Sequence, residues 1–158
     1  MVKTKNLYRL PFSRNVKTKA ESDKSVFSHR GHMKHSLDFY MKVGTQILAA
    51  ADGKVTLVKD DSNEGGMEKK YRNNILKWMN RIEIKHANRE YSGYYHLKHK
   101  GVFVKKGQIV KKGQLIGLSG GTGWCDKPHL HFMVWKNFNR TPRLETLEIR
   151  FENKNRDC

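Results

Sequence analysis

The chain has 158 residues, and 37% of them are apolar, which is enough for the core of one globular domain. No apolar run is long enough to cross a bilayer, so we do not expect an integral membrane protein. The N-terminal stretch also lacks the apolar centre of a signal peptide, so the sequence predicts no route of export. The 32 basic and 15 acidic residues give a formal net charge of +17, which predicts affinity for polyanions such as envelope polymers or nucleic acid.

Three segments are expected along the chain. Residues 1–26 are polar and basic apart from an apolar patch around Tyr8 to Phe12, and they predict an arm that packs on the domain. Residues 27–151 are expected to form that single domain, and residues 152–158 a tail. Near the start of the domain, residues 29–38 predict a loop that runs into a strand and hold four candidate metal ligands: His29, His32, His35 and Asp38.

The middle of the chain is predicted to consist of two hairpins and one helix. Residues 47–51 and 54–58 read as two strands joined by a turn at Asp52-Gly53. Residues 67–79 place apolar side chains at helical spacing and predict a short amphipathic helix. Residues 81–86 alternate between polar and apolar, and 91–97 follow after a turn, which predicts a second hairpin whose far strand carries His96.

The last part of the chain predicts further short strands. A Val-Lys-Lys-Gly-Gln phrase nearly repeats within residues 101–117 and indicates strands that turn on glycines. A glycine-rich loop at 119–123 leads to a strand at 128–135, and 144–151 predicts one more strand. Many short strands and few helices indicate a mainly β fold, either an antiparallel sheet or a sandwich.

His129 and His131 lie two residues apart on one predicted strand, so their rings point to the same face. Two such imidazoles can share one metal ion, or one can bind the metal while the other transfers protons. A hydrolytic zinc site needs three protein ligands of nitrogen or oxygen type and one open position. One histidine and Asp38 from residues 29–38, with one histidine from the later strand, complete such a set and leave two imidazoles for proton transfer and oxyanion stabilisation.

A series of phrases in residues 27–135 resembles the lysostaphin-type (LytM-like) zinc metallopeptidases, which cut peptide cross-links in bacterial peptidoglycan. The matching phrases, in family order, are Phe-Ser-His at 27–29, Leu-Asp-Phe at 37–39, Gly-Thr at 44–45, Ala-Ala-Asp-Gly-Lys-Val at 50–55, Ile-Lys-His at 84–86, Tyr-His-Leu at 95–97, Val-Lys-Lys-Gly-Gln at 104–108, Gly-Leu-Ser-Gly at 117–120 and Pro-His-Leu-His-Phe at 128–132. Together these phrases are specific, although each one alone is common.

The resemblance implies a β fold of the LytM type with its zinc site in a groove on the sheet. It implies one zinc ion per chain held by His29, Asp38 and His131, with His96 and His129 assisting proton transfer while a metal-activated water attacks the scissile carbonyl. It also implies a peptidoglycan peptide as substrate and a periplasmic or extracellular location. Glycyl-glycine and D-amino-acid cross-links both remain open as the bond that is cleaved.

The first ligand departs from the usual family motif, His-x-Gly-x-Asp, because Lys34 stands four residues before Asp38. His35 and His32 are closer to Asp38 in sequence than His29 is, so proximity alone favours them. We choose His29 because one branch of the family has a longer interval between Ser-His and Asp-Phe. His35 remains the second choice and His32 the third.

Two other residues are assigned no catalytic role. Cys125 precedes His129 by four residues, but Cys-x-x-x-His is not a recurrent zinc spacing, so we interpret Cys125 as a loop residue. Whether it pairs with Cys158 stays open. His86 is predicted to be structural.

Three other functions compete with the peptidase. A binding module similar to biotinyl and lipoyl carrier domains fits the Val-Lys-Lys-Gly-Gln phrase, but it leaves the His and Asp residues unexplained. A catalytically inactive LytM-like domain would bind cell wall or activate a partner hydrolase, but such domains usually lack some ligands and every required position here is filled. A basic nucleic-acid binder fits the charge, but no recognition motif is present, so we do not expect nucleic acid as a partner. Anionic cell-envelope polymers are the expected partners of the positive charge.

Overall fold

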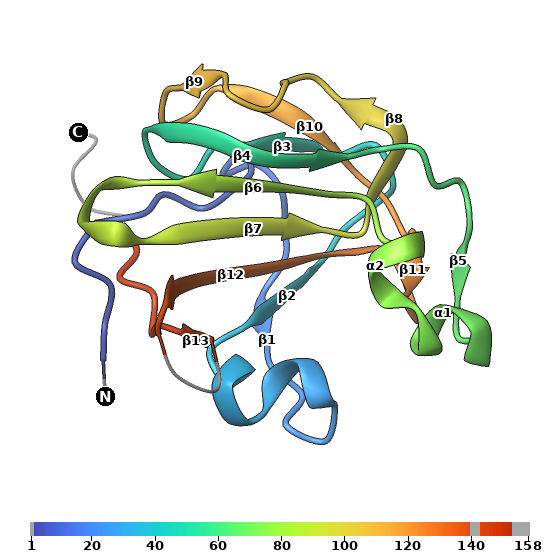
Figure 1. Ribbon diagram of the computed structural model, residues 1–158. Helices are drawn as coiled ribbons and strands as arrows, with labels where there is room; N and C mark the ends of the chain where they lie inside the picture. The colour runs from blue at the N-terminus through green and yellow to red at the C-terminus, as the bar shows by residue number, and fades with distance from the viewer. Residues whose placement is uncertain (1, 140–142, 153–158) are drawn as a thin grey trace.

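The computed structural model describes residues 2–139 and 143–152. A large antiparallel sheet dominates the fold, in the strand order β1-β2-β12-β7-β6-β4-β9, with β13 also paired to β12 (Figure 1). The strands of this sheet are β1 (Ala20–Glu21), β2 (Leu37–Tyr40), β4 (Gly53–Lys59), β6 (Arg81–Lys85), β7 (Tyr91–Tyr95), β9 (Ile109–Val110), β12 (His129–Asn137) and β13 (Leu144–Thr146). The predicted β-rich, antiparallel fold is confirmed.

A second sheet of three strands, in the order β3-β10-β8, is drawn in the upper part of Figure 1, in the same region as β4 and β9 of the large sheet. Its strands are β3 (Gln46–Leu48), β8 (Leu97–Val102) and β10 (Leu115–Ser119), and a small parallel pair is formed by β5 (Gly65–Gly66) and β11 (Gly123–Trp124). The helical elements are η1 (Phe27–His29), η2 (Gly31–Met33), α1 (Lys69–Asn73), α2 (Ile75–Trp78) and η3 (Ala87–Arg89). Among the described residues, no helix is long and apolar enough to span a membrane.

Side-chain alternation along the strands divides the large sheet into a core face and an open face. Ile82 and Ile84 of β6, like Leu130 and Phe132 of β12, are fully buried and join Ile47 and Ile116 of the second sheet in the main core. Alternate residues point the other way. On that side, Met79, Tyr95, Met133 and Trp135 form a smaller buried cluster. The open face of the sheet is therefore lined with apolar side chains.

The N-terminal segment contributes to this core. Tyr8 and Phe12 are almost fully buried, and Tyr8 forms a parallel bridge with Phe151 near the other end of the chain. The segment is held by the fully buried carboxylate of Glu90, which accepts hydrogen bonds from the Tyr8 hydroxyl, from the Asn6 side chain and from the backbone N–H groups of Lys5 and Asn6. The proposed division into arm, domain and tail is not tested by these contacts and stays a prediction.

The second predicted hairpin is confirmed, because β6 and β7 pair in antiparallel register from Arg81↔Tyr95 to Lys85↔Tyr91. The short strands that turn on glycines are also present, with Gly107 and Gly113 at positive φ between them. The first predicted hairpin is wrong. β3 pairs with β10 and β4 pairs with β6 and β9, since residues 49–51 cross from one sheet to the other. The Ala49 and Ala50 amides hydrogen-bond to Gln114 and to the Tyr94 hydroxyl instead of to β4.

The predicted helix over residues 67–79 is shorter and broken. Asn74 has φ −143° and ψ 65°, which ends α1 and starts α2. The predicted strand at 144–151 is reduced to β13 and single bridges at Glu148 and Phe151. The predicted tail beyond Glu152 and the open pairing of Cys125 with Cys158 lie outside the described residues.

Replacing Glu90 with alanine is expected to lower the free energy of unfolding by about 3 kcal/mol. The replacement leaves several buried hydrogen-bond donors of the N-terminal segment without an acceptor. Urea denaturation measures the loss as a lower midpoint. The matched control is Glu68→Ala, since the Glu68 side chain is 68% exposed and its loss should change stability by less than about 0.5 kcal/mol. Equal midpoints for the two variants would contradict the role given to Glu90.

Candidate metal centre and active-site groove

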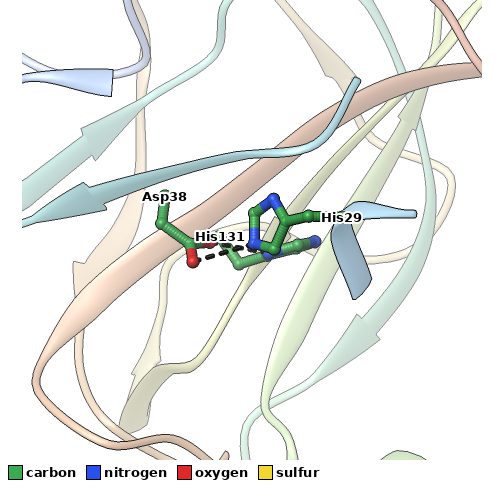
Figure 2. A group of neighbouring side chains, drawn as sticks. All are labelled: His29, Asp38 and His131. Atoms are coloured by element: carbon green, nitrogen blue, oxygen red, sulfur yellow. Dashed lines mark hydrogen bonds and ion pairs between the residues drawn. The ribbon is translucent and has the colours of Figure 1, made fainter. Parts of the chain in front are cut away.

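The pairing of β2 with β12 brings Asp38 and His131 directly opposite each other, although 93 residues separate them in sequence. Asp38 Oδ1 lies 2.8 Å from His131 Nδ1. The other carboxylate oxygen, Oδ2, lies 2.9 Å from His29 Nε2. Figure 2 shows the carboxylate facing both imidazole rings. These three residues offer ligand atoms that all lie within 4.8 Å of one another.

His29 reaches this position because it ends the 3-10 turn η1 and is then held by residue Ser36. Its Nδ1 lies 3.0 Å from the Ser36 carbonyl oxygen, which assigns the ring proton to Nδ1. Nε2 of the neutral ring then presents a lone pair to Asp38 Oδ2, and two acceptors facing each other are stable only with a proton or a metal cation between them. The donor set therefore fits a metal ion of the zinc type, which nitrogen and oxygen ligands suit.

The charges of the three residues are strongly coupled. Burial opposes ionisation of Asp38, but the hydrogen bonds to His131 and His29 outweigh it and hold the pKa of that carboxyl well below its usual range. Burial also opposes a charge on His29, yet Asp38 raises the pKa of His29. For His131, burial dominates over Asp38 and lowers the pKa. The trio thus combines an ionised carboxylate with at least one neutral imidazole.

His96 and His129 lie beside the trio, and both are buried. The centroids of their rings are 4.6 Å apart, and His129 Nε2 lies 3.6 Å from Asp38 Oδ1. The Nδ1 atoms are 2.7 Å from the Thr122 carbonyl in His96 and 2.7 Å from the Lys127 carbonyl in His129. These contacts assign the proton to Nδ1 in each ring, so Nε2 is left as the basic nitrogen. Burial, with the charges of His129 and His131, lowers the pKa of His96 to about 3.

His96 does not lie within the far strand of the hairpin as predicted. It follows β7 and adopts φ 65°, a left-handed conformation that is uncommon for a residue with a side chain. The conformation separates β7 from β8, which belongs to the other sheet. His96 therefore lies at the point where the chain changes sheets, next to the ring of His129.

The other candidate histidines lie outside this group. His32 is exposed, and His35 donates its backbone N–H to the Thr146 side chain and is half-buried. His86 is buried between the Asp52 carbonyl and Ser92, at 2.7 Å from each, and burial lowers its pKa. The structure thus brings His29, not His35 or His32, to Asp38.

Cys125, Asp126 and His129 form a second group whose potential ligand atoms lie close together. Burial raises the pKa of the Cys125 thiol to about 12, and the thiol donates a hydrogen bond to the Lys127 carbonyl. A thiol held protonated is a poor metal ligand, since the thiolate is the binding form. The interpretation of Cys125 as a loop residue is kept.

A groove with a cavity of about 500 Å³ is lined by Asp38 and His131 and by both further histidines, whereas His29 lies behind this lining. Its walls come from η1, the loop before α1, α2, β11 and the open face of the large sheet. The sequence patterns did not identify most of the apolar and aromatic side chains that line it: Phe27, Met33, Met67, Ile75, Leu76, Met79, Tyr95, Trp124 and Met133. The positions of Tyr95 on β7 and of Met133 on β12 are the signal that could have shown that these two side chains share a face with His131.

Tyr95 forms part of the floor of the groove. Its ring centroid lies 5.7 Å from that of His131, and its hydroxyl donates to Glu83 Oε1 at 3.3 Å. The ring lies over Gly93, where an added Cβ would overlap it. Gly93 is therefore required for the position of Tyr95.

An antiparallel sheet with a His-Asp-His donor set, two further histidines and an open groove is an arrangement that suits a hydrolytic metal site. The chain belongs to peptidase family M23, whose family model matches residues 32–142. That match starts three residues after His29, so the placement of His29 rests on the geometry alone.

Among curated relatives, the chain is 37% identical to lysostaphin of Staphylococcus simulans over 107 residues, covering 68% of this chain and 19% of the relative. It is 36% identical to the peptidoglycan DD-endopeptidase ShyA of Vibrio cholerae over 109 residues, covering 69% of this chain and 20% of the relative. The matches thus span about a fifth of the length of these relatives.

Solved structures show the same fold. The catalytic domain of lysostaphin from Staphylococcus simulans superposes with a TM-score of 0.58 and 28% identity, over 84% of this chain and 89% of that one. A zinc-containing peptidase from Vibrio cholerae gives a TM-score of 0.58 and 28% identity, over 82% of this chain and 36% of that one.

Substitution of the candidate ligands is expected to show that His29, and not His35, binds zinc. The parent should hold about one zinc per chain. His29→Ala and His131→Ala should lose most of it after dialysis, because two remaining ligands bind zinc weakly, whereas His35→Ala should keep it. Elemental analysis by mass spectrometry measures the zinc content. Loss of zinc from His35→Ala with retention by His29→Ala would reverse the assignment.

Proposed function

We propose that the chain is a zinc-dependent endopeptidase that hydrolyses peptide cross-links in bacterial peptidoglycan. The observation that carries the proposal is the convergence of His29, Asp38 and His131 beside His96 and His129, at an open groove that all of these residues except His29 line. Membership of peptidase family M23 supports peptide hydrolysis, and the relatives named peptidoglycan DD-endopeptidase and lysostaphin support the substrate.

In this proposal His29, Asp38 and His131 hold the zinc ion. When bound, zinc supplies Lewis acidity that polarises a carbonyl group and lowers the pKa of water to near 7. The Ser36 carbonyl fixes the tautomer of His29, and the pairing of β2 with β12 fixes Asp38 relative to His131. These contacts orient the proposed ligands for the metal.

His96 and His129 carry the proton transfers. Backbone carbonyls hold the Nδ1–H group of each ring, so Nε2 is free to accept a proton from water and, once protonated, to donate a hydrogen bond to the carbonyl oxygen as negative charge develops there. The low pKa of His96 keeps its ring neutral at neutral pH, which is the form that accepts a proton. His129 lies beside the carboxylate of Asp38, with Nε2 3.6 Å from Asp38 Oδ1.

Replacing His96 with alanine is expected to reduce cleavage of purified peptidoglycan by about 10²- to 10⁴-fold, because a general base or an oxyanion donor is lost. Zinc content should stay at the parental level, since His96 is not one of the three proposed ligands. Release of soluble fragments from peptidoglycan measures cleavage. His99→Ala is the control, because His99 is exposed on β8 and does not line the groove.

Undiminished cleavage by His96→Ala would refute the assigned mechanism. A parent that binds peptidoglycan and zinc but releases no fragments would instead favour the alternative, an inactive domain that binds cell wall or activates a partner hydrolase.

The proposed substrate places the protein in the cell envelope, periplasmic or extracellular. The net charge of +17 would then concentrate it on anionic envelope polymers, which we propose as its partners.

Binding of the protein to whole cell walls is expected to weaken several-fold between 50 and about 300 mM salt, because screening shortens the reach of the surface charge. Co-sedimentation with purified walls, before and after chemical removal of their anionic polymers, measures this effect. Binding that is insensitive to salt, or unchanged by removal of the polymers, would contradict the role of charge.

A further inference from the structure

The groove differs in charge from the rest of the molecule. Although basic residues outnumber acidic ones by 32 to 15, none of the described residues that line the groove is Lys or Arg. Apart from the candidate ligand Asp38, the lining includes three acidic residues, Asp23, Glu83 and Asp126. Asp23 and Asp126 are exposed, whereas Glu83 is half-buried among apolar side chains. Glu83 is thus the one of these three whose charge water screens least.

Glu83 is held close to the metal centre by the sheet. It lies on β6 and pairs with Gly93 of β7, two residues before Tyr95, which pairs with His131 of β12. The Tyr95 ring extends over Gly93, so its hydroxyl reaches Glu83 Oε1 at 3.3 Å while its ring stays 5.7 Å from that of His131. One tyrosine side chain therefore spans the interval between the Glu83 carboxylate and a proposed zinc ligand.

Within residues 2–139 and 143–152, the Glu83 carboxylate has no ion-pair partner. No Lys, Arg or His nitrogen of the described chain forms an ion pair with it. Arg81, two residues earlier on β6, directs Nη1 to the carbonyls of Leu76 and Met79 instead. Burial raises the pKa of Glu83, and the charge of Arg81 and the hydrogen bond from Tyr95 offset only part of that effect. A carboxylate that is partly removed from water without a paired cation lowers the stability of the free protein.

We propose that Glu83 is a specificity-determining residue that binds a primary ammonium group on the substrate peptide. The inference rests on the proposed function and narrows the substrate to peptidoglycan peptides with a free amine on a diamino acid. An ammonium group supplies the missing cation through a charge-assisted hydrogen bond. Met79 and Met133 line the same groove and provide adaptable apolar contacts for the methylene stem that carries the amine.

The test compares one peptide with and without its amine. The probe is a synthetic stem tetrapeptide with lysine in the third position, and its partner is the same peptide acetylated on Nζ. Isothermal titration into the zinc-loaded parent should show about tenfold tighter binding of the free amine, as expected for a hydrogen bond between charged groups. This comparison uses only the parent protein, so it does not depend on the folding of a variant.

Glu83→Gln keeps the side-chain volume and an acceptor for the Tyr95 hydroxyl but removes the charge. It should weaken binding of the amine peptide about tenfold, leave the acetylated peptide unchanged, and so abolish the discrimination. Glu152→Gln is the matched control, because Glu152 pairs with Lys112 and does not line the groove. It should keep the parental preference.

Three results would overturn the proposal. The parent could bind the two peptides with equal affinity, or it could bind neither of them at millimolar concentration. Glu83→Gln could also weaken the binding of both peptides equally, which would indicate a merely structural role. Hydrolysis of whole peptidoglycan is measured in parallel. A parent that prefers the amine but cleaves nothing contradicts the proposed function alone, whereas a parent that cleaves without preference contradicts the role of Glu83 alone.

Discussion

The candidate metal centre depends on the pairing of β2 with β12, which fixes a largely buried carboxylate beside two imidazoles. The Asp38 side chain is only 14% exposed, so its charge needs compensation from within the protein. Backbone hydrogen bonds place His131 opposite it, and a 3-10 turn places His29 on its other side. His129, two residues before His131, shares their face because side chains alternate along a strand. This one register therefore places Asp38, His129 and His131.

The features predicted correctly from sequence are those governed by short-range periodicity. The spacing of His129 and His131 fixes their common face, and the alternation of residues 81–86 with the turn that follows fixes the hairpin of β6 and β7. The grouping of His29, Asp38 and His131 was implied by resemblance to a family, since sequence proximity alone favoured His35. The geometry distinguishes His29 from His35 because the Ser36 carbonyl holds the His29 ring with its other nitrogen toward Asp38. Their roles as ligands stay a proposal.

The features that sequence patterns missed depend on contacts between distant segments. Residues 47–51 and 54–58 have the composition of a hairpin, but they join different sheets. The Ala49 and Ala50 amides donate hydrogen bonds to the Gln114 carbonyl and to the Tyr94 hydroxyl. The left-handed conformation of His96 arises where the chain passes between these sheets, and no local signal marks it. Glu83 belongs to a plain alternating strand. Its position in the groove emerges only when β6, β7 and β12 are aligned.

The packing of Tyr95 over Gly93 has a consequence for how this groove can diverge. Any side chain at position 93 collides with the ring, so an exchange there is tolerated only after Tyr95 has become smaller. Loss of the ring first leaves a void beside His131, which a side chain at 93 can then fill. The two positions are therefore epistatic, and the order of mutation is constrained. Changes in the depth of the groove should occur as paired replacements at 93 and 95 across related chains.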